Sequence, residues 1–290
     1  MPLTSEYAFK QVGNWNLLVL SEHWNESLWT RVLDSLRQQR PTTHPQIKRF
    51  VYPEGQDGNE FYLKVYYSCS LMEKIRDVFR DSKAFRALKQ GEALKRENFR
   101  VPLVVAAGEE RKLRVLHRAF LLTRGISGSP LSVFARDHFA SPLDSTSLRK
   151  KRHYLRQLAT EVRRLHRCGF VHGDLTPYNI LVQSDGDHVC FFFLDNDRTR
   201  RYLLGVPQML WRRNLIQLNR FVLPGISLQD RMRFLRIYLG TGTWERRDRH
   251  LIAWLEEHTR RRRAEKNGFR AQVSFRELMR WNGPFSQGSN

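Results

Sequence analysis

The side chains best suited to chemistry are a carboxylate and an amide, Asp174 and Asn179, in the segment His172-Gly173-Asp174-Leu175-Thr176-Pro177-Tyr178-Asn179. An apolar, strand-like run follows this segment, and a second one, residues 189–194, leads into Asp195 and Asp197. Phosphoryl transfer needs one carboxylate that accepts the proton of the attacking hydroxyl, and an amide and a further carboxylate that hold Mg²⁺. The order of these groups therefore predicts ATP-dependent phosphoryl transfer, with Asp174 as the base and Asn179 and Asp195 as the Mg²⁺ ligands.

Taken singly, each of these residues has an ordinary structural explanation. An Asp that follows a glycine is usually a turn residue, and an Asn before an apolar run is usually a cap or a turn. In this order, with strand-like runs between them, they match the catalytic loop and metal-binding strand of the protein-kinase-like fold. Asp197 has two interpretations, a group that reaches a second metal or a substrate hydroxyl, and a cap for the following turn. His172 is interpreted as a structural histidine.

The elements ahead of this segment predict a small β-rich lobe. Strands are expected at 15–20, 47–52, 60–67, 101–107 and 115–122, and helices at 26–39 and 82–97. Turn-forming residues at 53–59 and 108–111 predict two hairpins. Helices are then expected at 148–168, where Gly169 stands at the C-terminal cap, near 208–221, at 228–239 and at 246–263. We expect a two-lobed, protein-kinase-like α+β fold with an N-lobe over 1–122, a helical C-lobe over 123–282 and a tail over 283–290.

The N-lobe offers candidates for nucleotide binding. Lys64 lies on the second strand of the first predicted hairpin, where such a fold needs a lysine to hold the α- and β-phosphates. Glu92 on the following helix is its expected partner, with Glu97 as the alternative. Gly55 and Gly58 lie in the hairpin turn that would cover the phosphates, although the turn lacks a G-x-G-x-x-G pattern and is equally compatible with a plain hairpin loop.

The charge of the chain indicates a polyanionic partner. Its 290 residues carry a formal net charge of +21, which attracts nucleic acid, anionic membrane surfaces or phosphorylated glycolipid. Arg198, Arg200 and Arg201 follow the metal-binding strand and could meet an anionic acceptor, although a solvated basic face is the competing interpretation. Three cysteines without a CxxC pair favour a reducing compartment over a disulfide framework or a zinc site. No secretory signal is visible, and the apolar runs are far shorter than a membrane span of about 20 residues, so membrane contact would be peripheral.

The catalytic segment, together with Leu194-Asp195-Asn196-Asp197-Arg198, resembles the lipopolysaccharide kinases of the Kdo/WaaP family. Residues 213–220 look like the family's R-x-N-L-x-x-L-x-R stretch, and residues 230–239 look like its closing helix. The resemblance covers about residues 48–240. The chain departs from the family pattern at Asn196, where an aromatic is usual, and in its loosely formed glycine loop.

This resemblance implies an ATP-dependent kinase that phosphorylates a sugar hydroxyl, of Kdo or heptose, in the lipopolysaccharide inner core. Its acceptor would be an anionic glycolipid, and the enzyme would be cytoplasmic and peripheral to the inner membrane. RIO-type and Bud-type atypical kinases and aminoglycoside phosphotransferases carry similar H-G-D-L-x-x-x-N segments. A protein or small-molecule kinase of the same fold, and a basic binding module that retains the fold, are therefore the alternatives, and nucleic acid is the competing polyanion.

Overall fold

The computed structural model describes residues 6–53, 58–68, 77–78, 80–140, 142–186 and 188–267. The described residues belong to two compact units, of which the first spans Met1–Ser127 together with Phe192–Arg200 and the second spans Gly128–Phe191 and Arg201–Asn290. The sequence interpretation places residues 192–200 with the helical lobe, whereas their contacts place them in the first unit. The predicted tail over 283–290 lies outside the described residues.

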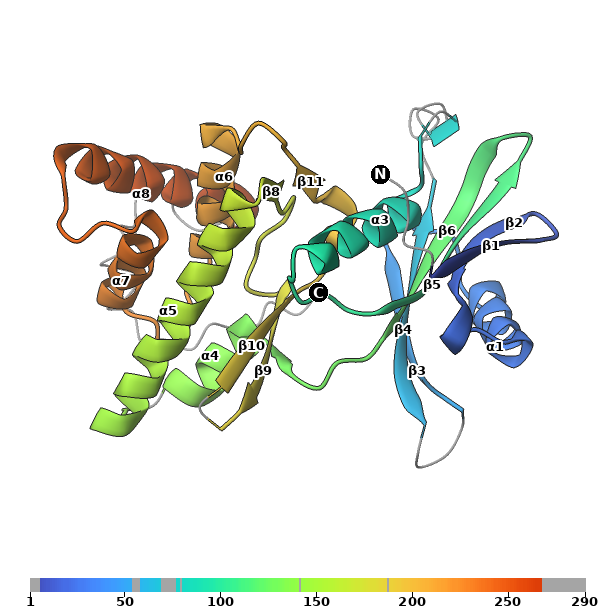
Figure 1. The fold of residues 1–290 in the computed structure, drawn as a ribbon, viewed down its shortest axis with the longest axis horizontal. Helices are drawn as coiled ribbons and strands as arrows, with labels where there is room; N and C mark the ends of the chain where they lie inside the picture. The colour runs from blue at the N-terminus through green and yellow to red at the C-terminus, as the bar shows by residue number, and fades with distance from the viewer. Residues whose placement is uncertain are drawn as a thin grey trace. The chain divides into compact units, whose positions relative to one another are not determined.

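The first unit contains a six-stranded antiparallel sheet in the order β1-β2-β5-β6-β4-β3 (Figure 1). Its elements are β1 (Tyr7–Val12), β2 (Trp15–Leu20), the short helix η1 (Ser21–His23), α1 (Glu26–Arg37), β3 (Gln46–Tyr52), β4 (Asn59–Tyr67), α3 (Lys83–Arg96), β5 (Val104–Lys112), β6 (Val115–Arg124) and the short helix η2 (Asn196–Arg198). The predicted hairpin of β3 and β4 is confirmed, with Tyr52 opposite Asn59 at its end.

Each face of this sheet is covered by one helix, as Figure 1 shows for α1 and α3. Side chains alternate between the faces along a strand, so Leu17 and Val19 pack with the α1 side chains in one core, and Leu18 packs with those of α3 in the other. Both helices begin with a side-chain cap, since Asn25 accepts from Leu28 N and Ser82 accepts from Phe85 N. The central strands of the sheet are therefore buried on both faces, and α3 is fixed against one of them.

The hairpin turn predicted at 108–111 is wrong. These residues belong to β5, and the turn that joins β5 to β6 lies at Leu113 and Arg114, which adopt positive φ angles of 50° and 68°. Gly108 attracts a turn interpretation, but in the structure a side chain there would collide with Phe120. The glycine is needed for close packing across the sheet and not for a turn.

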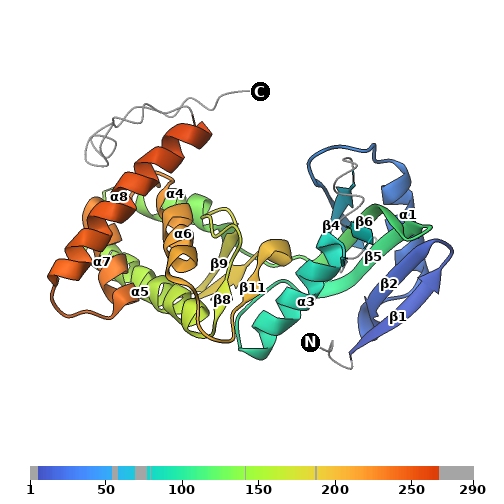
Figure 2. The ribbon, with the colours of Figure 1, turned by 90° about the horizontal axis from the view of Figure 1, so that it is seen from above.

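The second unit is mainly helical (Figure 2). Its elements are β7 (Ser129–Pro130), α4 (Leu131–Phe139), α5 (Ser145–Arg167), β8 (Phe170–Val171), β9 (Ile180–Asp185), β10 (His188–Phe193), β11 (Arg200–Arg201), α6 (Gln208–Asn219), α7 (Leu228–Leu239) and α8 (Arg246–Asn267). The strands form a three-stranded sheet, β10-β9-β7, and a pair, β11-β8.

Helix α5 leads into β8, the strand that precedes residues 172–179. Its apolar stripe, which includes Leu158, Val162 and Leu165, is buried. Gly169 follows the end of the helix with a φ of +84°, as a residue beyond a C-terminal cap requires. A side chain at Gly169 would also meet the carbonyl oxygen of Tyr202, whose N–H donates to the Gly169 carbonyl. None of the helices in the described ranges is both long and apolar enough to span a bilayer.

Candidate functional site

The turn that follows β10 presents the two aspartates of the first unit. Asp195 adopts a left-handed conformation with φ 59° and ψ 54°, directly before η2. The buried Asn196 stabilises this turn, because its Nδ2 donates to Phe193 O at 2.9 Å and its Oδ1 accepts from Thr199 Oγ1 at 3.3 Å. An aromatic ring could not make these hydrogen bonds. Asn196 therefore positions Asp195 and Asp197 through polar contacts with the backbone and the neighbouring hydroxyl.

Lys64 on β4 forms an ion pair with Asp195, with 2.5 Å between Nζ and Oδ1. The sequence predicts Glu92 as the partner of Lys64, and this stays a prediction. Glu92 is buried on α3 and accepts a hydrogen bond from Tyr7 at 3.4 Å, while Glu97 lies at the C-terminal cap of α3. The strand that carries Tyr7 has no recognisable apolar pattern in the sequence, because most of its residues are exposed.

The two aspartates form a partly buried acidic pair. Burial, and after it the charge of Asp195, raises the pKa of the Asp197 carboxyl to about 6, against the opposing charges of Lys64 and Arg198. Tyr66, two residues after Lys64, packs beside this pair, and burial together with the charges of Asp197 and Asp195 raises the pKa of its hydroxyl well above its ordinary value. A cation would relieve the repulsion between the two carboxylates.

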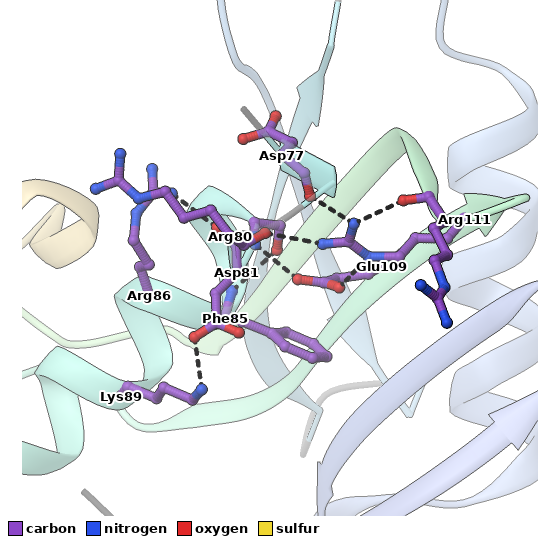
Figure 3. A network of polar contacts seen from close by, with 10 residues as sticks. Asp77, Arg80, Asp81, Phe85, Arg86, Lys89, Glu109 and Arg111 are labelled. Carbon is purple, nitrogen blue, oxygen red and sulfur yellow. Dashed lines mark hydrogen bonds and ion pairs between the residues drawn. The ribbon is translucent and has the colours of Figure 1, made fainter. Parts of the chain in front are cut away.

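A network of polar contacts holds the N-terminal end of α3, as Figure 3 shows. The buried carboxylate of Glu109 accepts from the N–H of Ser82 at 2.7 Å and forms an ion pair with Arg111 at 2.7 Å. Arg111 also donates to the carbonyl oxygens of Asp77 and Arg80. A carboxylate at a helix N-terminus satisfies N–H groups that the helix leaves unpaired, so this end of α3 is fixed to β5.

The same end of α3 carries a link to the aspartate turn. Arg86 donates from Nη1 to the carbonyl oxygen of Asp81, and its Nε lies 3.5 Å from the carbonyl oxygen of Asp197. Lys89 pairs with the Asp81 carboxylate. Sequence reasoning missed Arg86 and Tyr66, because neither belongs to a recognisable motif.

In the second unit, the segment around Asp174 is a tightly hydrogen-bonded loop. Asn179 donates from Nδ2 to the backbone oxygen of Asp174 at 2.9 Å and to its carboxylate at 3.3 Å. The Asp174 N–H donates to the ring Nδ1 of the fully buried His172 at 3.1 Å, which agrees with a structural role for this histidine. The Asn179 Nδ2 atom is thus engaged by Asp174, and its amide oxygen is the group suited to a metal ion.

Two polar side chains of α6 form hydrogen bonds with the backbone of this loop. Asn214 accepts from the N–H of His172 at 3.1 Å and donates to the carbonyl oxygen of the same residue. Gln217 donates to the carbonyl oxygen of Gly173 and accepts from the N–H of Leu175. Asn214 is 1% and Gln217 is 6% exposed. They contact the backbone on both sides of Asp174. The sequence signal that could have found them is a pair of amide side chains, three residues apart, among the apolar residues of a predicted helix.

The other residues predicted to bind nucleotide or acceptor have few described contacts. Gly58 directly precedes β4, and Gly55 lies outside the described residues. Arg198 and Arg200 are exposed, whereas the Arg201 guanidinium lies 5.1 Å from the centre of the Phe170 ring.

The predicted chemical groups therefore form two local sets. Lys64, Asp195 and Asp197 come together in the first unit, and Asp174 and Asn179 come together in the second. Within the described ranges, no three His, Cys, Asp or Glu side chains gather closely enough to hold a metal ion by themselves.

Comparison with known proteins places this arrangement in a family. The model of the lipopolysaccharide kinase (Kdo/WaaP) family matches residues 30–238. The solved structure of WaaP in complex with acyl carrier protein superposes with a TM-score of 0.59 at 21% identity, over 81% of this chain and 95% of that one. Two crystal structures of the PknI kinase domain of Mycobacterium tuberculosis match at 12% and 13% identity, over 85% of this chain and 80% and 81% of theirs, with a TM-score of 0.37.

A search of curated proteins found no match. The fold assignment rests on the WaaP structure, since the PknI matches are too distant to support it. The family match covers well over half of the chain and includes the ion pair at Lys64, the loop at Asp174 and the supporting helix α6. The chain therefore belongs to the lipopolysaccharide kinase (Kdo/WaaP) family of phosphotransferases and has a kinase-like fold.

Proposed function

We propose that this protein is an ATP-dependent kinase that phosphorylates a sugar hydroxyl, of Kdo or heptose, in the lipopolysaccharide inner core. The observation that carries the proposal is the loop at Asp174, whose backbone is fixed on both sides by Gln217 and whose carboxylate is held by Asn179. A general base must be positioned within hydrogen-bonding reach of the hydroxyl that it deprotonates. A rigid loop with a partly exposed aspartate meets this requirement.

The side chains present fit ATP and Mg²⁺. Mg²⁺ prefers oxygen ligands and is commonly bound through one or two carboxylates, substrate phosphates and water. We assign Asn179 and Asp195 as its ligands and Lys64 as the group that binds the α- and β-phosphates, and Mg²⁺ would neutralise the charge that develops on the transferred phosphoryl group. Lys64 already pairs with Asp195 at 2.5 Å, so it is poised beside the metal-binding carboxylate. Asp197, in the same turn, is assigned to a second metal or to the acceptor.

The test of this function is Asp174→Ala, with Asp185→Ala as the matched control, because Asp185 is an exposed aspartate at the end of β9 in the same unit. Removal of a general base typically costs about 10²- to 10⁴-fold in rate, and we expect this loss in Asp174→Ala with ATP affinity retained. Transfer should occur to isolated lipopolysaccharide core. Wild-type turnover in Asp174→Ala contradicts the assignment, and transfer to a protein extract alone favours a protein kinase of this fold.

A second proposal concerns where the enzyme acts. The formal charge of +21 suits an anionic glycolipid, and we propose a cytoplasmic enzyme that is peripheral to the inner membrane. Binding to vesicles that contain lipopolysaccharide should weaken steeply as salt is added, because the distance over which charges interact shortens to about 8 Å at physiological ionic strength. Tight binding to RNA or DNA at physiological salt, without binding to these vesicles, contradicts the glycolipid proposal.

The complex of WaaP with acyl carrier protein suggests a protein partner for this chain. The second unit contains a cavity of about 620 Å³, lined mostly by apolar side chains such as Phe134, Leu158, Leu218 and Leu235. A cavity of this kind suits an apolar ligand. We propose that an acylated acyl carrier protein binds this chain and places its acyl chain there.

The partner proposal is tested by thermal unfolding with acylated carrier protein and with the same carrier that lacks the acyl group. A ligand that binds only the folded state raises Tm, and the stabilisation grows with the logarithm of one plus the ratio of ligand concentration to Kd. Only the acylated form should raise Tm. Equal shifts from both forms, or no shift from either, contradict the acyl site.

A further inference from the structure

The segment at the end of α6, Asn219 to Phe221, is fixed by two guanidinium groups from later helices. Arg231 on α7 donates from Nη1 to the backbone and side-chain oxygens of Asn219, and from Nη2 to the carbonyl oxygen of Phe221. Arg263 on α8 is 4% exposed and donates from Nε to the carbonyl oxygen of Arg220 at 2.8 Å. The backbone of three consecutive residues is thus held, and the side chain of Arg220 projects from a rigid base.

Arg220 lies close to the catalytic loop. Gln217, three residues earlier, contacts the backbone of Gly173 and of Leu175, on either side of Asp174. Residues three apart on a helix share one face, so Arg220 faces the same loop one turn further on. Burial lowers the pKa of the Arg220 guanidinium, and the charge of Asp174 opposes this shift. The guanidinium therefore lies within the electrostatic reach of the assigned base.

Among the described residues, no ion pair joins Arg220 to Asp174 or to another carboxylate, and its buried Nε atom donates to no partner. The charge of Arg262 on α8 lowers the pKa of Arg220 further, so two like charges lie near one another. Like-charged groups at short range are destabilising unless an anion lies between them.

Two aromatic rings complete the surroundings. The Arg220 guanidinium lies 4.6 Å from the centre of the Phe221 ring, and Phe221 packs edge-to-face against Tyr178 with 5.1 Å between ring centres. Tyr178 belongs to the catalytic loop, four residues after Asp174, and its side chain is 55% exposed. An exposed tyrosine ring beside the assigned base is accessible to a ligand and offers it both an apolar face and a hydroxyl.

We propose that Arg220, with Arg262 beside it, binds an anionic group of the acceptor, a phosphate or a carboxylate, while Tyr178 and Phe221 pack against the acceptor sugar. This inference rests on the proposed function, because only an acceptor that presents its hydroxyl to Asp174 brings its neighbouring groups to Arg220. A planar guanidinium binds phosphate and carboxylate oxygens in pairs. The enzyme would therefore select acceptors that already carry a negative charge next to the hydroxyl that is phosphorylated.

The experiment compares Arg220→Gln and Arg220→Lys with the wild type on core oligosaccharide. Loss of a charged hydrogen-bonding pair should raise the acceptor KM about tenfold or more, with kcat and the ATP KM within about twofold. The acceptor KM of Arg220→Lys should lie between those of wild type and Arg220→Gln, because an ammonium keeps the charge without the planar geometry. The matched control is Arg247→Gln, an exposed arginine that pairs with Glu245 and lies about 22 Å along α8 from Arg262.

The source of the anion is identified by repeating the assay with phosphatase-treated and with carboxyl-reduced oligosaccharide. The defect of Arg220→Gln should vanish on the acceptor that lacks the recognised group. An unchanged acceptor KM in Arg220→Gln overturns the proposal, and so does an equal defect on all three acceptors.

A direct binding measurement separates this proposal from the proposed function. If the wild type does not phosphorylate the oligosaccharide, the proposed function fails. Calorimetric titration of the intact and anion-stripped oligosaccharides into wild type and Arg220→Gln still tests the anion site without turnover. Weaker binding of the intact form by Arg220→Gln supports the site, whereas equal binding, or no binding by either protein, overturns it. Arg220→Lys provides the same comparison if Arg220→Gln does not fold.

Discussion

Replacement of Asn214 by alanine should destabilise the protein and displace the loop that carries Asp174. Asn214 is 1% exposed. Its Oδ1 accepts from the N–H of His172 at 3.1 Å and lies 3.0 Å from Nε2 of His166. Its Nδ2 donates to the carbonyl oxygen of His172 and to Oε1 of Gln217. Alanine leaves all four of these buried groups without the partner that Asn214 supplied.

The cost follows from those four contacts. Each net hydrogen bond contributes about 1 kcal/mol, and an unsatisfied buried group costs about 1–3 kcal/mol. A water molecule in the vacated space would restore part of the hydrogen bonding. We therefore expect Asn214→Ala to lower the free energy of unfolding by about 2–4 kcal/mol. The loop should also shift, and displacement of a catalytic group by about 1 Å can cost about 10²-fold in rate.

The assay combines urea unfolding with steady-state kinetics at a temperature where the variant is folded. Asn214→Ala should lose about 10- to 100-fold in kcat, and the ATP KM should change less, because Asn179 is in this loop but Lys64 and Asp195 lie in the other unit. Arg213→Ala, an exposed neighbour on α6, is the control and should stay within about 0.5 kcal/mol of wild type. A folded Asn214→Ala enzyme with wild-type kcat would refute the positioning role, even if its stability were reduced.

Three further outcomes are expected. Asp195→Ala should lose Mg²⁺-dependent nucleotide binding, because the triphosphate charge is then uncompensated, and equal Mg·ATP binding by calorimetry would show that Asp195 is not a ligand. Burial lowers the pKa of His166 from 6.5 to about 4. As pH falls, the His166 imidazole is therefore protonated in the unfolded chain before it is protonated in the folded one. The stability that the buried neutral imidazole contributes is present above pH 6.5 and is lost as pH falls toward 4. The loss amounts to about 3 kcal/mol, and urea unfolding over this pH range should show it in wild type and much less of it in His166→Gln. Finally, replacement of Arg198, Arg200 and Arg201 by alanine should raise the acceptor KM more than the ATP KM, and steady-state kinetics with each substrate varied would detect the opposite order.

Local features of this protein can be predicted from sequence because neighbouring residues determine them. The apolar stripe of α5 and the glycine after it predict the helix and its end, and the alternating run in β4 predicts a strand of the first hairpin. Asp174 and Asn179 are five residues apart in one loop, so their spacing alone brings them together. The order of these elements also predicts the kinase-like fold and the family.

The tertiary structure decides which distant groups meet. Lys64 pairs with Asp195, 131 residues later, and Glu92 on α3 meets Tyr7 of the edge strand β1, whose sequence has no apolar pattern. Spacing in the sequence carries no record of such packing. The support of the Asp174 loop by α6, 42 residues away, is hidden for the same reason, since it depends on how the helix packs beneath the loop.

Backbone strain also escapes sequence patterns. The turn at Leu113 and Arg114 requires positive φ angles, which glycine and asparagine adopt most readily. Neither residue is present there, whereas Gly108, five residues earlier, is required by close contact with Phe120 inside the sheet. Packing across the sheet outweighs the local preference of the chain, and only the assembled structure shows which of the two prevails.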